Sequence, residues 1–443
     1  MTFHFPICIL SFMNPLAKEL NQILAGTACE ALLSEFGKRI YFPKGIVSQS
    51  SEATQHAKTY NATIGMAYES GNPIELSAIK EQLPVLNPKE AVAYAPTPGD
   101  ANLRSLWKKE IYRKNPSMGS AAVSEPVVVP GLTNGLSQIS DMFINPGDTI
   151  VVPDMFWGNY RLMMEVRNQG VIKEFPFYND KGTLNVEGFI STMKTSAVNG
   201  KIMVLMNFPN NPTGYSPTLA EGKALAEGIR GLAEEGYHIL VMTDDAYFGL
   251  FFGGDTLTES MFSLLADIHE NVLAVKIDGA TKEEYVWGFR VGFVTVNSKS
   301  MNASHYEAFN KKLGGALRGS ISNSSRPAQS MLLKAMQTNG YLEEKQRIAV
   351  SLKARYDKVV EVIGKRTTGL ALEPLPFNSG YFMSFYFKGG NAEELRKELL
   401  YSKGIGTISI KDEYLRIAYA SVDLDEIEDL YNEIFAAADK LAK

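Results

Sequence analysis

The stretch Ile202-Met-Val-Leu-Met206, followed by Asn207-Phe-Pro-Asn-Asn-Pro-Thr-Gly-Tyr215, decides the fold. Its first five residues are all apolar and lack the alternation of a strand that has one face in water. Such a run is typical of a strand buried on both faces, as in a parallel sheet covered by helices. The prolines and the glycine that follow fix a compact loop that displays asparagine side chains.

Similar apolar runs recur on both sides of this stretch, separated by longer helical patterns, between about residues 120 and 300. This alternation is typical of βαβ units. We therefore predict an α/β fold with a mostly parallel central sheet. The other predicted strands are Pro126–Val129, Thr149–Val152, Ile239–Met242, Val272–Ile277 and Val291–Val296.

The pattern changes after about residue 325, where a long helical stretch precedes short strands and a terminal helix. This change predicts three parts of the chain. Residues 1–70 form an N-terminal segment that packs with a small domain, residues 71–325 form the large α/β domain, and residues 326–443 form the small C-terminal α+β domain.

The composition points to small-molecule chemistry. The 443 residues carry a formal net charge of -5, and acidic and basic residues are interleaved, so no nucleic-acid-binding stripe is present. No apolar run reaches the ~20 residues of a membrane span. Cys8 and Cys29 form no metal-ligand or disulfide pattern, which predicts no metal site and a cytoplasmic location.

The first thirteen residues are apolar but lack a cationic leader and are interrupted by Pro6, so we do not expect a signal peptide. Met13 precedes Asn14-Pro15 and a helical pattern. Whether translation starts at Met1 or at Met13 stays open.

Ligands of open parallel sheets bind beyond the carboxyl ends of the strands, so the residues there deserve the closest reading. Gly131-Leu132-Thr133 forms a turn that opens a helix, where free N–H groups favour phosphate, although such turns are commonly structural joints. Trp157 is either a core residue or a platform for a flat ring. Asp244-Asp245-Ala-Tyr247 follows an apolar run, so we expect a buried cation opposite its acids.

The last strand end reads Asp278-Gly-Ala-Thr-Lys282, and Arg290 stands eight positions after the lysine, between Gly288 and Gly292. A lysine after a strand is usually solvated. Here it completes a series of strand ends that bear phosphate-binding, stacking, amide and acid groups. The pairs Glu283-Glu284 and Glu343-Glu344 are expected to be solvated helix faces.

The combination resembles the class I aminotransferases of the fold-type I pyridoxal-phosphate family. These enzymes carry N-P-T-G, D-x-x-Y and a lysine followed by G-x-R-x-G in this order, and the three strings occur here at Asn211, at Asp244 to Tyr247, and at Lys282 to Gly292. The resemblance extends over nearly the whole chain from about residue 60, and the aspartate and aromatic amino-acid aminotransferases are the most similar subgroup.

The resemblance implies that pyridoxal 5′-phosphate is the cofactor and that Lys282 forms the internal aldimine with it. Asp244 would pair with the pyridinium nitrogen and keep it protonated. Asn211 and Tyr247 would bind the phenolate oxygen. Once displaced by substrate, the Lys282 amine would move a proton between the substrate α-carbon and C4′ of the cofactor.

The remaining cofactor and substrate contacts are also implied by the resemblance. Arg290, with the turn of Gly131, Leu132 and Thr133, would hold the phosphate. Trp157 would stack on the ring and line the substrate site with Gly65. Arg416, assisted by Asn211, would grip the substrate α-carboxylate.

Two residues match positions that reach across a dimer interface in this family. Tyr94 would touch the phosphate bound by the partner, and Arg318 would read a side-chain carboxylate of the substrate. We therefore expect a homodimer with shared active sites. One departure stands out, since the family often has a phosphate-binding serine where this chain has Gly279, and we expect one phosphate contact fewer.

The predicted function is transfer of an amino group from an aspartate-like or aromatic L-amino acid to a 2-oxo acid such as 2-oxoglutarate, by a ping-pong mechanism. One alternative is a pyridoxal-phosphate lyase or decarboxylase on the same scaffold. A non-catalytic regulator would need a basic DNA-binding module, which is missing from the sequence before residue 60. A nicotinamide dehydrogenase would leave Lys282 unexplained, and no G-x-G-x-x-G follows the first strand.

Overall fold

The computed structural model describes residues 13–24, 33, 35–39, 46–82, 85–366 and 371–442. The questions about residues 1–12, Cys8 and Cys29 therefore fall outside the described residues. The strands described are β1 (Tyr60–Asn61), β2 (Tyr68–Glu69), β3 (Asn72–Pro73), β4 (Val127–Val129), β5 (Thr149–Pro153), β6 (Val171–Phe175), β7 (Lys201–Asn207), β8 (His238–Asp244), β9 (Val272–Gly279), β10 (Gly292–Asn297), β11 (Leu372–Pro374), β12 (Met383–Phe387), β13 (Ile405–Gly406), β14 (Ile408–Ile410) and β15 (Tyr414–Ile417).

The helices described are α1 (Pro15–Leu24), α3 (Glu35–Arg39), α4 (Ile46–His56), α5 (Ser77–Lys80), α6 (Pro88–Ala91), α7 (Ala101–Lys114), α8 (Leu132–Phe143), α9 (Asn159–Arg161), α10 (Val186–Thr195), α11 (Leu219–Glu234), α12 (Met261–Leu265), α13 (Ala280–Glu283), α14 (Ala303–Ser320), α15 (Arg326–Met336), α16 (Tyr341–Gly364), α17 (Ala392–Lys403) and α18 (Ile427–Leu441). Several begin where the sequence supplies a cap. Thr218 and Glu221, for example, form a capping box at the start of α11.

The central sheet has seven strands in the order β4-β10-β9-β8-β7-β5-β6. The pairs β5–β6, β5–β7, β7–β8 and β8–β9 are parallel, whereas β10 runs antiparallel to both β9 and β4. All residues of β4 and β10 are buried, and so are all but the first residue of β7 and β8. This arrangement confirms the α/β fold with a mostly parallel sheet.

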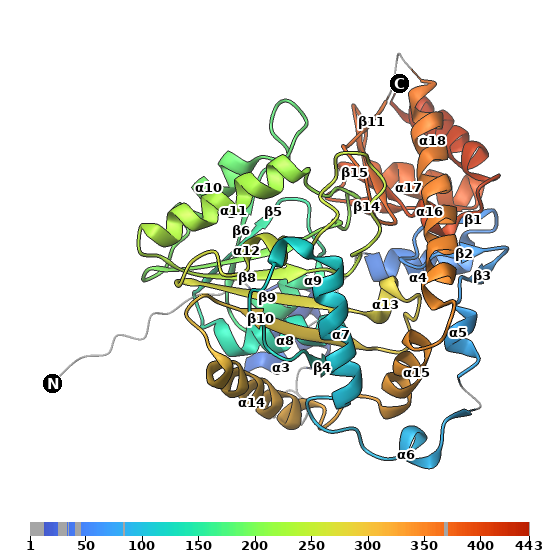
Figure 1. Cartoon of the computed structure of the whole chain (residues 1–443). Helices are drawn as coiled ribbons and strands as arrows, with labels where there is room; N and C mark the ends of the chain where they lie inside the picture. Colours follow the sequence, from blue (N-terminus) through green and yellow to red (C-terminus); the bar gives the residue numbers. More distant parts are fainter. Residues whose placement is uncertain are drawn as a thin grey trace.

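Helices cover both faces of the sheet (Figure 1). The helices α10, α11 and α12 pack against β5 to β9 on one face, whereas α8 packs on β9 and β10 and is covered by α14. This distribution follows from right-handed crossovers, because the chain moves in opposite directions along the sheet before and after β6. The carboxyl ends of the parallel strands therefore meet at one edge.

Strand β6 was not predicted from the sequence. Its burial alternates irregularly, with Val171, Lys173 and Glu174 exposed, because it lies at the open edge of the sheet beside β5 only. An edge strand that is half in water lacks the continuous apolar run by which the other strands were found.

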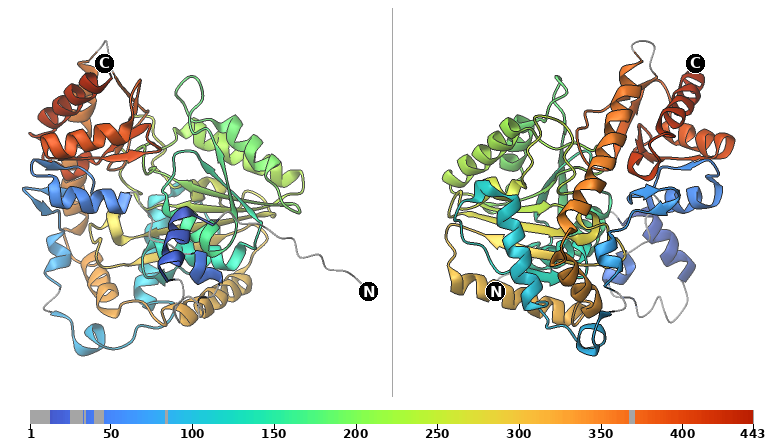
Figure 2. Two further views of the ribbon diagram at one scale, coloured as in Figure 1. Left: turned by 180° about the vertical axis from the view of Figure 1, so that it is seen from behind. Right: turned by 45° about the vertical axis from the view of Figure 1, so that its right-hand side comes forward.

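A second apolar core lies beside the sheet. It combines the antiparallel sheet β11-β12-β15-β14 with α17 and α18. The short strand β1 pairs in parallel with β13, so that Tyr60 lies opposite Ile405, and α4 contacts β13 and β14. The N-terminal residues 46–62 thus lie against the C-terminal part of the chain (Figure 2).

Helix α16 joins the two cores. Its first half contributes Tyr341 and Leu352 to the core around the large sheet, and its second half contributes Val359 and Val362 to the second core. Figure 2 shows it running lengthwise between the two parts. Among the described helices, none has the length and apolarity needed to cross a membrane.

Candidate active site

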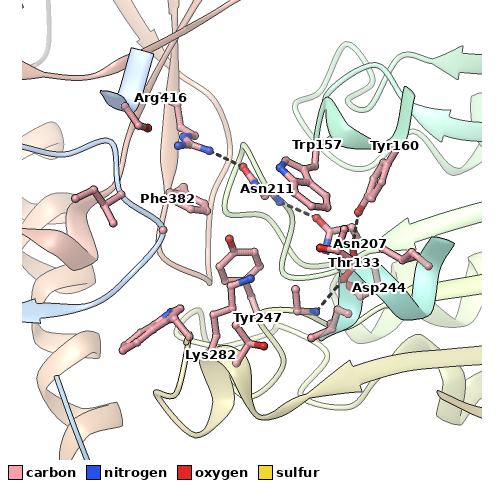
Figure 3. A pocket seen from close by; sticks show the side chains of 18 of the residues that line it. Thr133, Trp157, Tyr160, Asn207, Asn211, Asp244, Tyr247, Lys282, Phe382 and Arg416 are labelled. Carbon is pink, nitrogen blue, oxygen red and sulfur yellow. Dashed lines mark hydrogen bonds between the residues drawn. The ribbon is translucent and has the colours of Figure 1, made fainter. Parts of the chain in front are cut away.

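A cavity of about 400 Å³ opens at the carboxyl edge of the large sheet, where the second core adjoins it. Figure 3 shows the side chains that point into it from both parts of the molecule. Ten of the residues predicted from the sequence line it, namely Gly65, Leu132, Thr133, Trp157, Asn211, Asp244, Tyr247, Lys282, Arg290 and Arg416. The folded chain therefore brings together residues that stand up to about 350 positions apart.

Asp244 is the last residue of β8 and is buried. Tyr160 Oη donates a hydrogen bond of 2.6 Å to Asp244 Oδ2, and the backbone N–H of Ala246 donates to Oδ1 at 3.2 Å. Burial raises the pKa of Asp244 to about 6, although the Tyr160 hydroxyl and the positive charge of Lys282 oppose this rise. The Asp244 carboxyl group therefore changes charge close to neutral pH, and it lies where it can bind a cation.

The neighbouring Asp245 has a different partner. Its carboxylate forms a buried ion pair with Lys276 and accepts a hydrogen bond of 2.6 Å from Ser260 Oγ. The buried cation expected opposite these acids is therefore present, since Lys276 on β9 is only 1% exposed. Asp245 is neutralised in this way. Of the two carboxyl groups, that of Asp244 lines the cavity and that of Asp245 does not.

Lys282 lies in the one-turn helix α13, directly after β9, and its ammonium faces the cavity 4.7 Å from the centre of the Tyr247 ring. The pKa of Lys282 is lowered to about 8, mainly by burial. The charge of Asp244 opposes this shift, and the nearby Arg290 adds to it. At neutral pH the ammonium form still predominates, but roughly a tenth of the side chain is the neutral, nucleophilic amine.

Arg416 on β15 enters the cavity from the second core (Figure 3). Its guanidinium donates to Asn211 Oδ1 at 2.8 Å and to the carbonyl oxygen of Thr63 at 3.0 Å, and it lies 4.2 Å from the centre of the Phe382 ring. Burial lowers its pKa to about 10. The group stays cationic at neutral pH and has few competing partners.

Asn207 holds the loop that carries Asn211. Asn207 Nδ2 donates to the carbonyl oxygen of Asp244 at 2.8 Å, and its Oδ1 accepts from the backbone N–H of Asn211 at 2.9 Å. The loop after β7 is thereby fixed to the end of β8, with Asn207 directly opposite Asp244 in the sheet register.

The Gly131 turn and Arg290 meet at the other end of the cavity. Gly131 has a φ of 84°, and a Cβ there would lie 2.3 Å from Arg290 Nη2. The guanidinium also donates to the carbonyl oxygen of Trp287 at 3.0 Å. Thr133 lies in the first turn of α8, whose free N–H groups face the same region. Positive charge and unpaired donors thus converge where an anion can bind.

Gly279 lies beside this end of the cavity, three residues before Lys282. A Cβ at Gly279 would lie 2.6 Å from the carbonyl oxygen of Val291 and 2.7 Å from the Cα of Gly292. Both are backbone atoms, which cannot move aside cheaply. The position therefore has no room for the side chain of serine.

Trp157 lines the cavity and contacts Tyr160 edge to face, with ring centres 5.7 Å apart. Gly65 faces the cavity from the N-terminal segment, and a Cβ there would lie 3.4 Å from Phe382 and 3.6 Å from the Tyr247 hydroxyl. Both residues line the cavity between the two parts of the molecule.

Tyr94 and Arg318 do not line this cavity within a single chain. Tyr94 is 90% exposed. Arg318, on α14, is exposed beside a second cavity of about 870 Å³ and donates a hydrogen bond to Ser322 Oγ at 2.7 Å. If either residue contacts a cofactor or substrate, that molecule would have to be bound in the cavity of a second copy of the chain.

Sequence reasoning missed several residues of the site, namely Ser50, Thr63, Leu136, Tyr160, Asn207, Thr281, Trp287 and Phe382. Tyr160 follows Trp157 by three positions, and this closeness in the sequence to a predicted site residue was the only signal for it. Thr63 and Phe382 carry no signal, because only tertiary packing brings them to the cavity.

The expectation that Glu283 and Glu284 are solvated is wrong. Both are buried, and both accept hydrogen bonds from lysine ammonium groups. Glu344 is also not free, because its carboxylate accepts from the backbone N–H groups of Ser77 and Ala78 at the start of α5. The sequence pattern could not reveal cations that come from distant helices.

The cavity fits a flat cofactor that carries an anion. Among the described residues, Thr281 Oγ1, Trp287 Nε1 and Arg416 Nε are buried at its wall without a hydrogen-bond partner. Such orphaned atoms are rare in folded proteins and indicate a missing ligand. The lining offers an acid for a ring nitrogen, an amine for an aldehyde and a cationic end for a phosphate, which is the donor set that pyridoxal phosphate requires.

Fold and site together define a pyridoxal-phosphate-dependent transaminase. The family model described as "Aminotransferase class I and II" matches residues 65–434, and the chain belongs to this family. The family binds pyridoxal 5′-phosphate.

Among curated relatives, the cytoplasmic aspartate aminotransferase of Oryza sativa is 24% identical over 84% of this chain and 89% of its own length. The aspartate aminotransferase of Thermotoga maritima is 26% identical over 78% of this chain and 85% of its own length. A solved aminotransferase from Anaerococcus prevotii superposes with a TM-score of 0.80 at 21% identity, covering 93% of this chain and 100% of the other, and confirms the fold.

Proposed function

We propose that the protein transfers the amino group of an aspartate-like or aromatic L-amino acid to a 2-oxo acid such as 2-oxoglutarate, in two half-reactions at the Lys282 cavity. The observation that carries the proposal is the arrangement of Lys282, Asp244 and Arg416 around one cavity of about 400 Å³. The relatives from Oryza sativa and Thermotoga maritima, both named aspartate aminotransferase, support this choice of substrate.

Bound pyridoxal phosphate supplies an aldehyde that condenses with amines and a ring that withdraws electrons from the substrate α-carbon. In the proposal, Asp244 binds the protonated ring nitrogen, and the Tyr160 hydroxyl keeps that carboxylate oriented. Asn211 and Tyr247 bind the ring oxygen, and Trp157 covers the ring face. Arg290 and the turn of Gly131, Leu132 and Thr133 bind the phosphate, with no side chain contributed by Gly279.

Lys282 is proposed to hold the cofactor covalently and then to move the proton that leaves the substrate α-carbon. The burial that lowers its pKa to about 8 suits both tasks, because an amine with a pKa near the working pH can accept and return a proton. Tyr247, whose pKa burial raises, stays a neutral hydrogen-bond donor beside it.

Arg416 is proposed to bind the substrate α-carboxylate. Its Nε is buried without a partner in the described structure, and Asn211 orients the guanidinium from the opposite side. A planar guanidinium binds a carboxylate through two parallel hydrogen bonds, which fixes the α-carbon next to Lys282. The Phe382 ring and Gly65 close the space around this contact.

Tyr94 and Arg318 are proposed to act across a homodimer interface. Tyr94 would contact the phosphate bound by the partner, and Arg318 would read the side-chain carboxylate of an acidic substrate. The exposure of both side chains and their absence from the cavity lining of their own chain support this assignment. A cytoplasmic role in amino-acid biosynthesis fits such a reaction and completes the proposal.

An absorbance scan of the cofactor-loaded protein tests the proposal most directly. We expect a visible band that borohydride removes, and mass spectrometry should then find the reduced adduct on Lys282. The Lys282→Ala variant should bind the cofactor without the adduct and lose turnover by at least about four orders of magnitude. Aspartate-dependent formation of glutamate from 2-oxoglutarate, without release of ammonia or carbon dioxide, separates amino transfer from elimination and decarboxylation. An adduct on another residue would refute the assignment.

A further inference from the structure

A cluster of buried ionic groups surrounds the turn that carries Lys282. We infer that Glu283 and Glu284, held by Lys114, Lys345 and Tyr341, are positioning residues that fix the Lys282 turn and tie it to helix α16. The inference rests on the proposed role of Lys282 but assigns a task to residues outside the cavity lining.

The helix that carries Lys282 is too short to be stable without contacts from other elements. The four residues of α13, Ala280–Glu283, have no side-chain cap at the N-terminus. A single helical turn loses the full conformational entropy of helix nucleation and gains very few hydrogen bonds in return, so it is unstable by itself. In addition, Glu283 and Glu284 place negative charge at the C-terminal end, which the helix dipole disfavours. Contacts from other elements must therefore stabilise this turn.

Those contacts come from two distant helices. Lys114, the last residue of α7, lies with Nζ 2.5 Å from Glu283 Oε1. Lys345 Nζ of α16 lies 2.7 Å from Glu284 Oε1 and 3.5 Å from Glu283 Oε1, and Tyr341 Oη donates a hydrogen bond to Glu284 Oε2. Lys282 is thus followed directly by two anchored residues.

The cluster is well buried and electrically balanced. The side chains of Glu283 and Glu284 are 7% and 2% exposed, and those of Lys114 and Lys345 are 13% and 18% exposed. Burial opposes ionisation of both carboxyl groups, but Lys114 and Lys345 lower the pKa of Glu283 to about 2. Burial and the charge of Glu283 raise the pKa of Glu284, and Lys345 opposes this rise. Two carboxylates meet two ammonium groups, so removal of any one leaves an unpaired charge in a poorly hydrated place, which is costly.

Lys345 and Tyr341 connect the cluster to a distant part of the molecule, because both lie on the long helix α16. They lie in the first two turns of the helix that continues into the second core, from which Arg416 enters the cavity. The cluster therefore links the turn of Lys282 to α16. Through α16 it is connected to the second core, which carries Arg416, the proposed binding residue for the substrate carboxylate. The charged and titratable groups that face Lys282 itself are Asp244, Tyr247 and Arg290.

The test compares cofactor-loaded full-length variants Lys345→Met, Glu284→Gln and the double variant that combines them. The double variant restores charge balance and should fold even where a single variant is unstable. Two properties are measured, namely the pH midpoint of the visible absorbance band and the kcat and KM of amino transfer. The control is Glu393→Gln, which removes an ion pair with the buried Arg396 in the other core.

We expect the double variant to shift the absorbance midpoint by at least about half a pH unit and to lower kcat roughly tenfold or more, with KM nearly unchanged. The single variant Lys345→Arg keeps the positive charge and should therefore retain most of the wild-type midpoint and kcat. The control variant Glu393→Gln should leave both properties unchanged. A folded double variant with the wild-type midpoint and kcat would overturn the inference and leave a stabilising role only. If wild-type protein itself lacks a borohydride-sensitive band, the proposed function has failed instead.

Discussion

At the scale of single residues, burial sets the chemistry of the cavity. Asp244 and Lys282 carry opposite charges, yet burial moves their pKa values toward each other, to about 6 and about 8. Each group therefore changes charge at a pH close to neutral. The Tyr160 hydroxyl matters because it favours the ionised form of Asp244, which burial disfavours.

The Tyr160→Phe substitution should raise the pKa of Asp244, since the hydrogen bond of 2.6 Å that lowers it is lost. More of the carboxyl group is then protonated at neutral pH, and the acidic limb of the kcat/KM profile should move upward by about one pH unit. A pH profile of amino transfer measures this shift.

Tyr112→Phe is the matched control, because its hydroxyl donates to the carbonyl oxygen of Ala121 at 2.7 Å, outside the cavity. Its acidic limb should stay at the wild-type pH. An unchanged limb in Tyr160→Phe would show that this hydroxyl does not tune Asp244.

Much of the site could be predicted from the sequence because its residues stand directly after strands, where chain order and sheet geometry agree. Asp244 and Lys282 are examples, since β8 and β9 end beside each other. The contacts among them were not predictable. Tyr160 on Asp244, Thr63 on Arg416 and Lys345 on Glu284 all depend on how separate elements pack, and no local spacing encodes that packing.

At the scale of elements, the turn between β4 and α8 is shaped to hold Arg290. Gly131 adopts a φ of 84°, which disfavours any residue with a Cβ, and the guanidinium of Arg290 occupies the place of the missing side chain. Arg290 itself has a φ of 54°. Two unusual backbone conformations thus bring one guanidinium beside one helix N-terminus.

The Gly131→Ala substitution should weaken cofactor binding, because its methyl group displaces the Arg290 guanidinium and strains the backbone. A cost of about 1–2 kcal/mol corresponds to roughly a tenfold higher Kd for pyridoxal phosphate. Titration of the cofactor-free protein followed by absorbance measures this Kd.

Gly231→Ala in α11 provides the comparison, since a Cβ there meets no atom within 4 Å. This change should stabilise the protein by up to about 1 kcal/mol and leave the Kd unchanged. Equal Kd values for wild type and Gly131→Ala would remove Arg290 from the phosphate site.

At the scale of the whole molecule, the fold followed from the sequence where strands are buried on both faces, as β7, β8 and β9 show. The edge strand β6 and the two-residue strand β1 escaped prediction, because neither has a long apolar run. The path of α16 through both cores was also unpredictable, since its sequence shows a helix but not what each half contacts.

The proposed dimer predicts how substrate choice depends on Arg318. Arg318→Ala should reduce kcat/KM for aspartate at least roughly tenfold more than for phenylalanine, because only the acidic side chain offers a carboxylate to the guanidinium. Steady-state kinetics with both amino acids measure the ratio.

Lys311→Ala, on the same helix and beside the same second cavity, is the control and should change both substrates alike. Equal losses on aspartate and phenylalanine in Arg318→Ala would contradict the assignment of this arginine to the substrate carboxylate.

The crowded backbone at Gly279 limits which residues position 279 can hold. Gly279 and Gly292 face each other across β9 and β10, and each approaches the backbone of its neighbours too closely for a Cβ. A serine would fit at position 279 only together with a second change that moves these strands apart. A single substitution therefore cannot place a side-chain hydroxyl at this corner of the cavity.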